Sequence, residues 1–272
     1  MKKYLPKIIA AHDLSGVGKA SLTAVIPILS VMGNYVCPLQ TAALSTITGV
    51  FEGYTFTDLT EHMRGTIKHW KELNIDFDYI YSGFLGSPEQ VDVIIDAKRM
   101  FDCSLVVDPV FADDGELYPT MNECMVFNMK RLVSVADIIT PNITEAMFLL
   151  NENKIPETEN EIREWLKRLC DIGPSLSLIT SCRIDGKMYV CAYDRKEDRY
   201  IITDCRFYPG SFHGTGDVFT TVLTGAIARG QNAEEAIKLA VDFVRHAIEE
   251  TVENGIAPRE GIAIEKILKD LM

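Results

Sequence analysis

The run Gly214-Thr215-Gly216-Asp217 sets an acid beside a glycine-rich turn, just before a long segment with apolar residues such as Val218 at helical spacing. That spacing predicts a helix with Asp217 in its first turn. Free backbone N–H groups and the helix dipole bind anions at a helix N-terminus, and the glycines let a phosphate approach the backbone. A carboxylate beside this site can take a proton from an incoming hydroxyl group. The dipole alone also favours an acid there, so the motif leaves a purely structural role open.

Acidic residues also follow a second predicted strand end, in the segment VVDPVFADD (residues 106–114). Asp108 ends the strand, Pro109 stops it, and Asp113 and Asp114 follow in the loop. Clustered carboxylates beyond a strand suit a hydrated Mg²⁺ ion that carries phosphate oxygens. The structural alternative is a solvated acidic loop, and for Asp114 we favour that alternative.

Two more segments carry hydroxyl, amide or carboxyl groups where predicted strands end. In ITPNITEAMFLL (139–150), Thr140, Asn142 and Glu145 lie where a strand turns into a helix. Asn142 fits an N-cap with Glu145 at the third helical position, so a capping box competes with a ligand-binding role for both residues. In LITSCR (178–183), Thr180 and Ser181 are predicted to end a strand with hydroxyls available to a phosphate.

Strand and helix patterns alternate along most of the chain, which predicts a mostly parallel sheet covered by helices on both faces. The turn at Asp185-Gly186 predicts a hairpin that adds antiparallel strands at one edge. From Thr215 onward the pattern is helical, and no linker, repeat or low-complexity segment divides the chain, so we expect one domain over residues 1–272. The expected strands cover residues 7–11, 35–39, 79–82, 105–108, 137–140, 176–180, 188–193 and 200–204, and a helix over 88–101 follows Ser87 as N-cap.

In such a sheet a ligand lies beyond the carboxyl ends of the parallel strands, where the four polar segments meet. The glycine-rich stretch after the first strand, DLSGVGKAS (13–21), does not match a phosphate-binding P-loop. Gly18-Lys19 is followed by Ala20, and Asp13 occupies the place of the first glycine. We interpret the stretch as a loop that opens a helix on the substrate side, with Lys19 at the surface.

Composition excludes several other classes of function. The chain has 272 residues, 47% of them hydrophobic, and a formal net charge of −12, which argues against nucleic acid or an anionic membrane as partner. No apolar run approaches the roughly 18 residues of a membrane span, and the apolar run near the N-terminus is too short for a signal peptide. The seven cysteines are scattered without a C-x-x-C pair, which is typical of a reducing compartment. We therefore expect a cytoplasmic protein.

The order of the motifs, DPV…D, TPN..E, ITS and then GTGD before a helix, resembles the ribokinase-like superfamily and, within it, the pyridoxal kinases. The resemblance covers essentially the whole chain and includes LSTITG (44–49) and YSGFLGSPEQ (81–90). It implies a three-layer α/β/α fold with a small antiparallel edge. It also implies ATP-dependent phosphorylation of the 5′-hydroxymethyl group of pyridoxal, pyridoxine or pyridoxamine, with Mg²⁺ and a homodimer, and it leaves a monovalent cation such as K⁺ open.

Carried over residue by residue, the resemblance implies a role for each motif. Asp217 is the base for the hydroxymethyl group, and Asp113 and Glu145 help to hold Mg²⁺, directly or through water. The remaining residues fall into three sets. An anion hole for the transferred phosphoryl group is formed by Gly214, Thr215 and Gly216; the phosphates of ATP are lined by Asp108, Thr140, Asn142, Glu145, Thr180 and Ser181; and the vitamer is bound by Ala11, His12, Asp13, Thr48 and Phe84.

Two positions depart from the pattern of the pyridoxal kinases. Phe84 stands where the family often has Tyr, so a stacking ring remains without its hydroxyl. Ala11-His12 stands where a Ser-His pair is usual, and Asp13 is a candidate to replace that Ser as acceptor for the substrate. Both departures affect contacts to the ring, so they bear on which vitamer is preferred.

Two alternative functions remain. The related hydroxymethylpyrimidine kinases of thiamine synthesis typically have Cys at the position of Asp217, which argues against that chemistry, although the loop around Asp13 resembles that branch. A non-catalytic binding protein of the same fold is the second alternative. We expect such a protein to have lost Asp217 or the Gly-Thr-Gly turn, and both are present. A dinucleotide oxidoreductase is disfavoured because no G-x-G-x-x-G follows the first strand.

Overall fold

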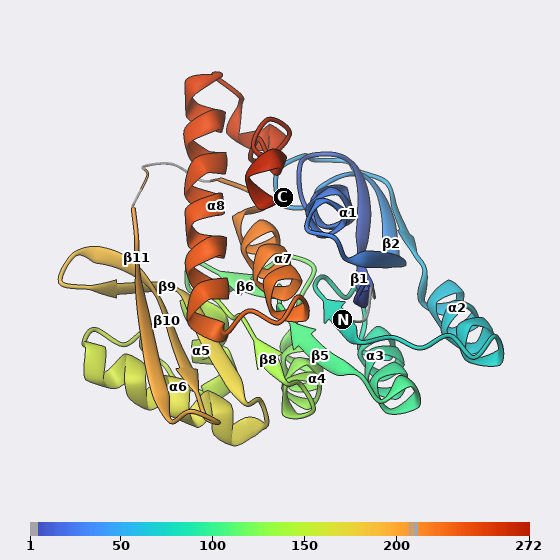
Figure 1. Cartoon of the computed structure of the whole chain (residues 1–272), viewed down its shortest axis with the longest axis horizontal. Helices are drawn as coiled ribbons and strands as arrows, with labels where there is room; N and C mark the ends of the chain where they lie inside the picture. The colour runs from blue at the N-terminus through green and yellow to red at the C-terminus, as the bar shows by residue number, and fades with distance from the viewer. Residues whose placement is uncertain (1–4, 207, 209–211) are drawn as a thin grey trace.

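The computed structural model describes residues 5–206, 208 and 212–272, so Ser211 at the start of the glycine motif lies outside the described residues. Strands and helices alternate along the chain until α7, from which the structure is helical (Figure 1). The strands are β1 (Lys7–Val17), β2 (Tyr35–Thr46), β3 (Phe56–Asp58), β4 (Tyr79–Ser82), β5 (Ser104–Val107), β6 (Ala112–Asp113), β7 (Glu116–Leu117), β8 (Ile138–Ile139), β9 (Leu176–Ile184), β10 (Lys187–Asp194) and β11 (Arg199–Cys205). The helices are α1 (Leu22–Val31), α2 (Thr60–Glu72), α3 (Pro88–Phe101), α4 (Glu123–Ser134), α5 (Ile143–Leu150), α6 (Glu159–Ile172), α7 (Thr215–Ala228) and α8 (Ala233–Glu253), with 3₁₀ turns at Pro258–Glu260 and Leu268–Leu271.

The main sheet has the strand order β11-β10-β9-β8-β5-β4-β1-β2-β3 within the described residues. The strands from β9 through β2 run parallel to one another. The predicted hairpin adds β10 and β11 antiparallel at one edge, and its turn residues Asp185 and Gly186 have φ of 49° and 78°, the left-handed pair that a type I′ turn requires. The short strand β3 at the other edge and the β6–β7 hairpin were not predicted, because two or three residues carry no periodic signal.

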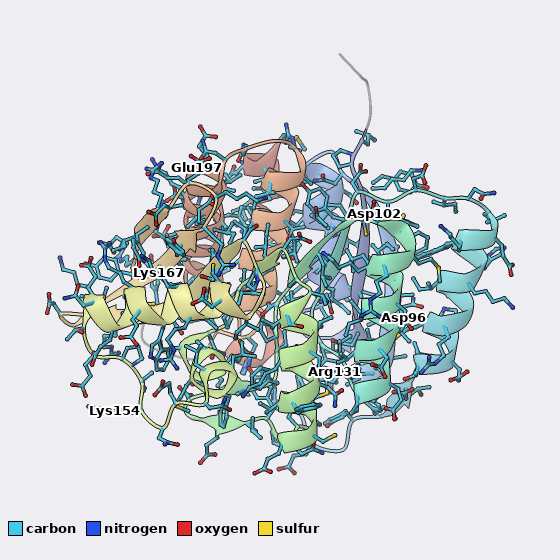
Figure 2. The ribbon with its side chains drawn as sticks, turned by 90° about the horizontal axis from the view of Figure 1, so that it is seen from below. Asp96, Asp102, Arg131, Lys154, Lys167 and Glu197 are labelled. Atoms are coloured by element: carbon cyan, nitrogen blue, oxygen red, sulfur yellow. The ribbon has the colours of Figure 1, made fainter. Side chains whose placement is uncertain are left out.

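Two hydrophobic layers cover the faces of this sheet and confirm the predicted α/β/α fold class. One layer joins the sheet to α1, α7 and α8, and the other joins it to α2 through α6 (Figure 1). Alternate residues of a central strand enter opposite layers: Val106 of β5 packs towards α7, whereas Leu105 and Val107 pack towards α3 and α4. Charged side chains such as Asp96 on α3, Arg131 on α4 and Lys167 on α6 lie on the outer faces of their helices (Figure 2).

The first two strands are longer than the sequence pattern predicts. β1 and β2 continue past β4, which ends at Ser82 opposite Ala11, and they pair with each other as far as Val17 and Thr46. The prediction of a loop from Asp13 onward was therefore wrong for the residues up to Val17. The register of the pairing shifts between His12 and Leu14, at Asp13. Such irregularities change the direction in which nearby side chains point.

The ninth strand is also longer than predicted. Thr180 and Ser181 do not end it, because pairing with β10 carries β9 on to Ile184. Cys182 is fully buried in this strand, in line with a packing role. The helices of the described part of the chain include none whose length and apolar content would let it cross a membrane.

Candidate active site

The N-terminus of α7 is held against the segment that leads into α1. Gly214 caps the helix with φ of 84°, and a Cβ at this position would lie 2.1 Å from the carbonyl oxygen of Lys19. Glycine alone combines this dihedral angle with so close an approach. A Cβ added to Gly216 would lie 3.8 Å from Oδ2 of Asp108, so the first turn of α7 faces that carboxylate. The candidate anion hole and the carboxylate of Asp108, which follows β5, therefore face each other.

Asp217 lies in this first turn, as predicted, and its side chain is 13% exposed. Its Oδ2 accepts the backbone N–H of Ser21 over 2.9 Å, and its Oδ1 lies 3.8 Å from Nδ1 of His12. Burial raises the pKa of Asp217 to about 7, while the Ser21 N–H opposes this and the charge of Asp13 adds to it. A carboxylate with a pKa near neutrality can accept a proton and keep it, which is what a general base needs.

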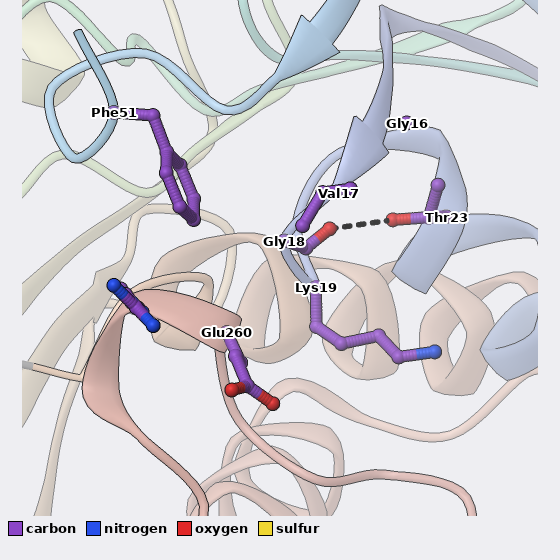
Figure 3. Close-up of a pocket in the computed structure, with 8 residues that line it drawn as sticks. Gly16, Val17, Gly18, Lys19, Thr23, Phe51 and Glu260 are labelled. Atoms are coloured by element: carbon purple, nitrogen blue, oxygen red, sulfur yellow. Dashed lines mark hydrogen bonds between the residues drawn. The ribbon is translucent and has the colours of Figure 1, made fainter.

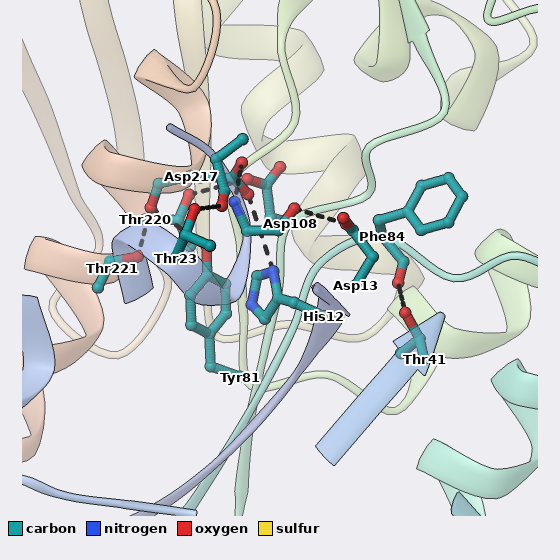
Figure 4. Close-up of polar contacts among 12 residues, drawn as sticks. His12, Asp13, Thr23, Thr41, Tyr81, Phe84, Asp108, Asp217, Thr220 and Thr221 are labelled. Carbon is teal, nitrogen blue, oxygen red and sulfur yellow. Dashed lines mark hydrogen bonds and ion pairs between the residues drawn. The ribbon is translucent and has the colours of Figure 1, made fainter. Parts of the chain in front are cut away.

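His12 is completely buried beside Asp217 and Tyr81 (Figure 4). Neither ring nitrogen has a hydrogen-bond partner among the described residues, and burial lowers the pKa of His12 to about 3. The ring packs edge-on against Tyr81 with centroids 4.3 Å apart, and the Tyr81 hydroxyl donates to the carbonyl oxygen of Asp217 over 3.3 Å. His12 is thus a neutral imidazole that faces the carboxylate.

Asp13 and Ser21 form a second buried polar group next to Asp217. Asp13 accepts the hydroxyl of Ser15 over 2.7 Å and that of Ser21 over 2.5 Å. Ser21 has φ of 50° and ψ of −139°, a region that residues other than glycine rarely adopt and that costs on the order of 1–3 kcal/mol. Neither Ser15 nor Ser21 was predicted as a site residue, because their partners are known only from the fold.

Asp108 is buried directly after β5, where the sequence predicted an acid at a strand end. Its Oδ2 accepts the hydroxyl of Thr220 over 3.3 Å, and that hydroxyl lies 2.8 Å from Oγ1 of Thr140. Burial raises the pKa of Asp108 well above its ordinary value, and the charges of Glu145 and Asp217 raise it further. This hydrogen bond connects Thr140 to α7. The contact of Thr140 with a nucleotide stays a prediction.

Glu145 and Asn142 form the predicted capping box at the start of α5. The Asn142 side chain accepts the N–H of Glu145 over 2.9 Å, and Oε2 of Glu145 accepts the N–H of Asn142 over 2.9 Å. Oε1 of Glu145 also accepts the N–H of Phe111 over 3.0 Å. Burial raises the pKa of Glu145 to about 8 despite these bonds. Both residues are therefore used for capping. Each carboxylate oxygen of Glu145 still has a lone pair that could accept a further hydrogen bond.

Asp113 lies in the β6–β7 hairpin rather than in a loop, and its side chain is exposed. Neighbouring residues partly shield the carboxyl group from water even though the side chain as a whole is exposed, and this partial desolvation raises its pKa. The N–H of Asp114 opposes the shift, the charge of Asp114 adds to it and His213 opposes it, so the two acids and His213 lie near one another. Ser181 accepts the N–H of Ile143 over 3.1 Å, and Thr180 stays half-buried beside it in β9. These segments meet at the start of α5, in agreement with their predicted convergence.

The acidic cluster fits a hydrated Mg²⁺ ion better than a directly bound metal. Among the described residues, no three His, Cys, Asp or Glu side chains come together closely enough to hold a metal. The negative charges of Glu145 and Asp217 contribute to the raised pKa of Asp108, so these three acids lie near one another. Mg²⁺ usually keeps several waters and takes one or two carboxylates plus the phosphates of a substrate. Such an ion matches this donor set.

Four of the five predicted substrate-side residues are buried, and only Thr48 is half-buried. Ala11 and His12 are fully buried and Asp13 is 6% exposed, so these side chains offer almost no surface to a ligand. Phe84 is 7% exposed and its carbonyl oxygen accepts the hydroxyl of Thr41 over 2.9 Å, while Thr48 is half-buried in the turn after β2. A cavity of about 560 Å³ opens between the end of β1 and the turn beyond β2 (Figure 3), lined by Gly16, Val17, Gly18, Lys19, Thr23, Phe51, Arg259 and Glu260.

This cavity adjoins the N-terminus of α7, because Lys19 lines it and also contacts Gly214. The Lys19 ammonium pairs with Glu265 over 2.5 Å and is 37% exposed, which confirms its predicted place at the surface. The cavity therefore lies next to the start of α7, at the tip of the extended β1–β2 pair.

Removing the charge of Asp108 is expected to stabilise the protein without ligands. Folded Asp108 keeps its proton to a higher pH than in the unfolded chain, so the folded state binds more protons and stability falls as the pH rises above about 4. Asp108→Asn should raise the free energy of unfolding by about 1–2 kcal/mol at pH 8 in the presence of a chelator. The gain should shrink towards pH 4. Urea unfolding at both pH values measures it, and an equal effect at both would contradict this electrostatic origin.

The fold and the acid beside a glycine-rich helix N-terminus define the class of ribokinase-like proteins. A family model described as phosphomethylpyrimidine kinase matches residues 53–260. The chain belongs to this phosphomethylpyrimidine kinase family. The match covers the acidic segments, the capping box and the anion hole, but it begins after β1 and β2.

Solved structures extend the similarity over the whole chain. A protein from Bacteroides thetaiotaomicron, provisionally named a phosphomethylpyrimidine kinase and crystallised with pyridoxal, is 44% identical, with a TM-score of 0.94 over 98% of this chain and 96% of its own. Pyridoxal kinase from Lactobacillus plantarum is 28% identical, with a TM-score of 0.91 over 98% and 97%. The chloroplastic thiamine biosynthetic bifunctional enzyme of Arabidopsis thaliana is 29% identical over 91% of this chain, which spans 47% of that longer protein.

Proposed function

We propose that this protein transfers the γ-phosphoryl group of ATP to the 5′-hydroxymethyl group of a B6 vitamer, as in the salvage of pyridoxal 5′-phosphate. The observation that carries the proposal is the carboxylate of Asp217, which lies in the same helix turn as the free N–H groups behind Gly214. The 44% identical relative crystallised with pyridoxal supports this substrate class. The resemblance to pyridoxal kinases, which have an acid at this position, supports it as well.

In this mechanism Asp217 takes the proton of the vitamer hydroxyl as its oxygen attacks the γ-phosphorus. The raised pKa of Asp217, about 7, lets the acid hold that proton until the product leaves. The transition state of phosphoryl transfer spreads negative charge over the equatorial oxygens, so alignment and charge neutralisation supply most of the rate. Backbone N–H groups of Thr215 and Gly216 would donate to those oxygens.

Asp108 and the start of α5 would lie along the phosphates of ATP. Thr180 and Ser181 on β9 present hydroxyls next to Asn142, which the resemblance assigns to the same phosphates. Asp113 and Glu145 would hold the waters of a Mg²⁺ ion. When bound, that ion neutralises charge on the phosphates and on the buried acids. We also propose that the enzyme works as a homodimer in the cytoplasm and that K⁺ stimulates it, which sedimentation and assays with and without K⁺ would check.

Phosphorylation of hydroxymethylpyrimidine is the second candidate. The description of the family model and the thiamine-related relative favour it. Asp217 argues against it, because the resemblance associates Cys at this position with that chemistry. Phe51, the half-buried aromatic residue that lines the cavity, would stack on either ring, so the cavity does not separate the two substrates.

A panel of substrates tests the proposal directly. ATP consumption is measured with pyridoxal, pyridoxine, pyridoxamine and hydroxymethylpyrimidine, and each product is identified by mass spectrometry. We expect kcat/KM for at least one B6 vitamer to exceed that for the pyrimidine by roughly 10-fold or more, the size of discrimination that one changed pocket contact supplies. A preference for the pyrimidine would favour the second candidate, and turnover of none of the four would refute both.

A further inference from the structure

Ser21 connects the two buried acids nearest to the proposed reaction centre. Its backbone N–H donates to Oδ2 of Asp217 over 2.9 Å, and its hydroxyl donates to Oδ1 of Asp13 over 2.5 Å. Ser21 lies 8 positions after Asp13 and 196 positions before Asp217. These bonds therefore arise from the tertiary fold rather than from a local turn.

The local geometry of Ser21 is unusual for a residue that precedes a helix. Serine at this position normally uses its side chain to accept an N–H of the first helical turn, and Ser21 makes no such bond to α1. Its φ of 50° and ψ of −139° also fall where glycine is the usual residue. Both deviations serve the same contacts: the hydroxyl turns to Asp13, and the N–H turns to Asp217.

We propose that Ser21 is a positioning residue, whose hydroxyl anchored on Asp13 holds a strained backbone so that its N–H orients the carboxylate of Asp217. The inference rests on the proposed function, in which Asp217 accepts the proton of the substrate. Asp13 would then act through Ser21 rather than by touching the substrate, in agreement with its burial and its two hydroxyl partners.

The contact has a predictable electrostatic effect. The N–H of Ser21 lowers the pKa of Asp217, whereas the charge of Asp13 raises it by a smaller amount. Loss of the N–H contact should therefore raise the pKa of Asp217, even if Asp13 loses its charge at the same time. The other titratable groups that face Asp217 are His12 on β1, Tyr81 on β4 and Asp108 after β5, and the hydrogen bonds of Ser21 go to Asp13 and Asp217 rather than to these groups.

Two variants and a matched control separate positioning from packing. Ser21→Ala removes the hydroxyl but keeps the Cβ that disfavours the strained conformation, so its backbone should leave that conformation, whereas Ser21→Gly removes the hydroxyl and adopts the conformation without strain. Ser15→Ala also removes one hydroxyl from Asp13, but Ser15 has no bond to Asp217. The profile of kcat/KM against pH is measured for each, together with the thermal unfolding midpoint and the KM for ATP.

Ser21→Gly adopts the conformation without strain and should keep more activity than Ser21→Ala. We expect Ser21→Ala to lower kcat roughly 10- to 100-fold, the scale of a misplaced catalytic group, and to leave KM for ATP nearly unchanged. The acid limb of the profile should move up by about half a unit to one unit, the shift expected for a weakened hydrogen bond to a charged group. Ser15→Ala should leave the limb in place or move it down. A Ser21→Ala variant that unfolds at lower temperature but keeps the wild-type acid limb would overturn the proposal.

A second measurement does not depend on enzymatic turnover. Aspartate labelled with ¹³C at the side-chain carboxyl reports the titration of Asp217 directly, with Asp217→Asn to assign the signal. A higher pKa of this carboxyl in Ser21→Ala supports the positioning role, even if the wild-type protein phosphorylates none of the tested substrates and the proposed function fails. An unchanged pKa in an active enzyme overturns the role of Ser21 while the proposed function stands.

Discussion

Replacing Asp217 with Asn is expected to lower kcat for phosphorylation of the vitamer roughly 10²- to 10⁴-fold, the usual scale for a placed general base. Asn can still accept the N–H of Ser21, so the geometry of the turn should persist, but its amide cannot take a proton. The change in KM for ATP should be much smaller, since in the proposed mechanism the phosphates contact the backbone N–H groups of the helix N-terminus rather than this side chain. Steady-state kinetics at saturating ATP measure both quantities.

A loss of folding would not explain this result. Asp217 carries a charge that burial disfavours, as its pKa of about 7 indicates, so the Asn variant should unfold at the wild-type temperature or above. Asp242→Asn on α8 is the control, because this acid is 48% exposed and pairs with Arg245 at the surface. Turnover near the wild-type value in Asp217→Asn would show that another group accepts the proton.

Gly214→Ala is expected to damage both stability and catalysis. The added Cβ would lie 2.1 Å from the carbonyl oxygen of Lys19, and that oxygen belongs to the backbone and cannot simply rotate away. Relief of the clash must displace either α7 or the segment before α1, and with it the N–H groups of the anion hole. We expect the free energy of unfolding to fall by about 2–4 kcal/mol and kcat to fall at least about 100-fold.

Gly230 supplies the matched control at the other end of the same helix. Its φ of 91° is also left-handed, but a Cβ there would meet nothing within 4 Å. Gly230→Ala should therefore lower the free energy of unfolding by only about 1 kcal/mol, because alanine disfavours the left-handed backbone, and should keep its activity. Denaturant unfolding and kcat are compared for the two variants. Equal losses would mean that the left-handed backbone, and not the contact with Lys19, makes glycine necessary at position 214.

Local patterns predicted the parts of the site that depend on neighbouring residues. The helix start at Asp217, the capping box of Asn142 and Glu145, and the turn at Asp185-Gly186 each follow from residue types a few positions apart, and all three are present in the structure. The parallel sheet and its helical layers followed from the alternation of apolar periods. Roles carried over from the resemblance, such as ring contacts of Phe84, stay predictions.

Contacts between distant segments could not be predicted in this way. The extension of β1 to Val17 depends on pairing with the end of β2, and nothing local to DLSGV distinguishes it from a loop. Ser21 offered no signal either, because its importance comes from a carboxylate 196 positions away. Serine before a helix predicts an N-cap, and here the tertiary contacts with Asp13 and Asp217 override that preference.

The contacts of Lys19 with residues near the C-terminus have a consequence for folding during synthesis. The backbone of Lys19 lies between Gly214 and Gly261, and its N–H donates to the carbonyl oxygen of Glu260 over 3.0 Å. A chain still emerging from the ribosome can pair β1 with β2 and β4 long before these late partners exist. Until residues 214–261 are synthesised and dock, Asp13 and Ser21 have no Asp217 to orient. The contacts that bring Asp217 to Ser21 therefore cannot form until the residues from Gly214 onward have been synthesised.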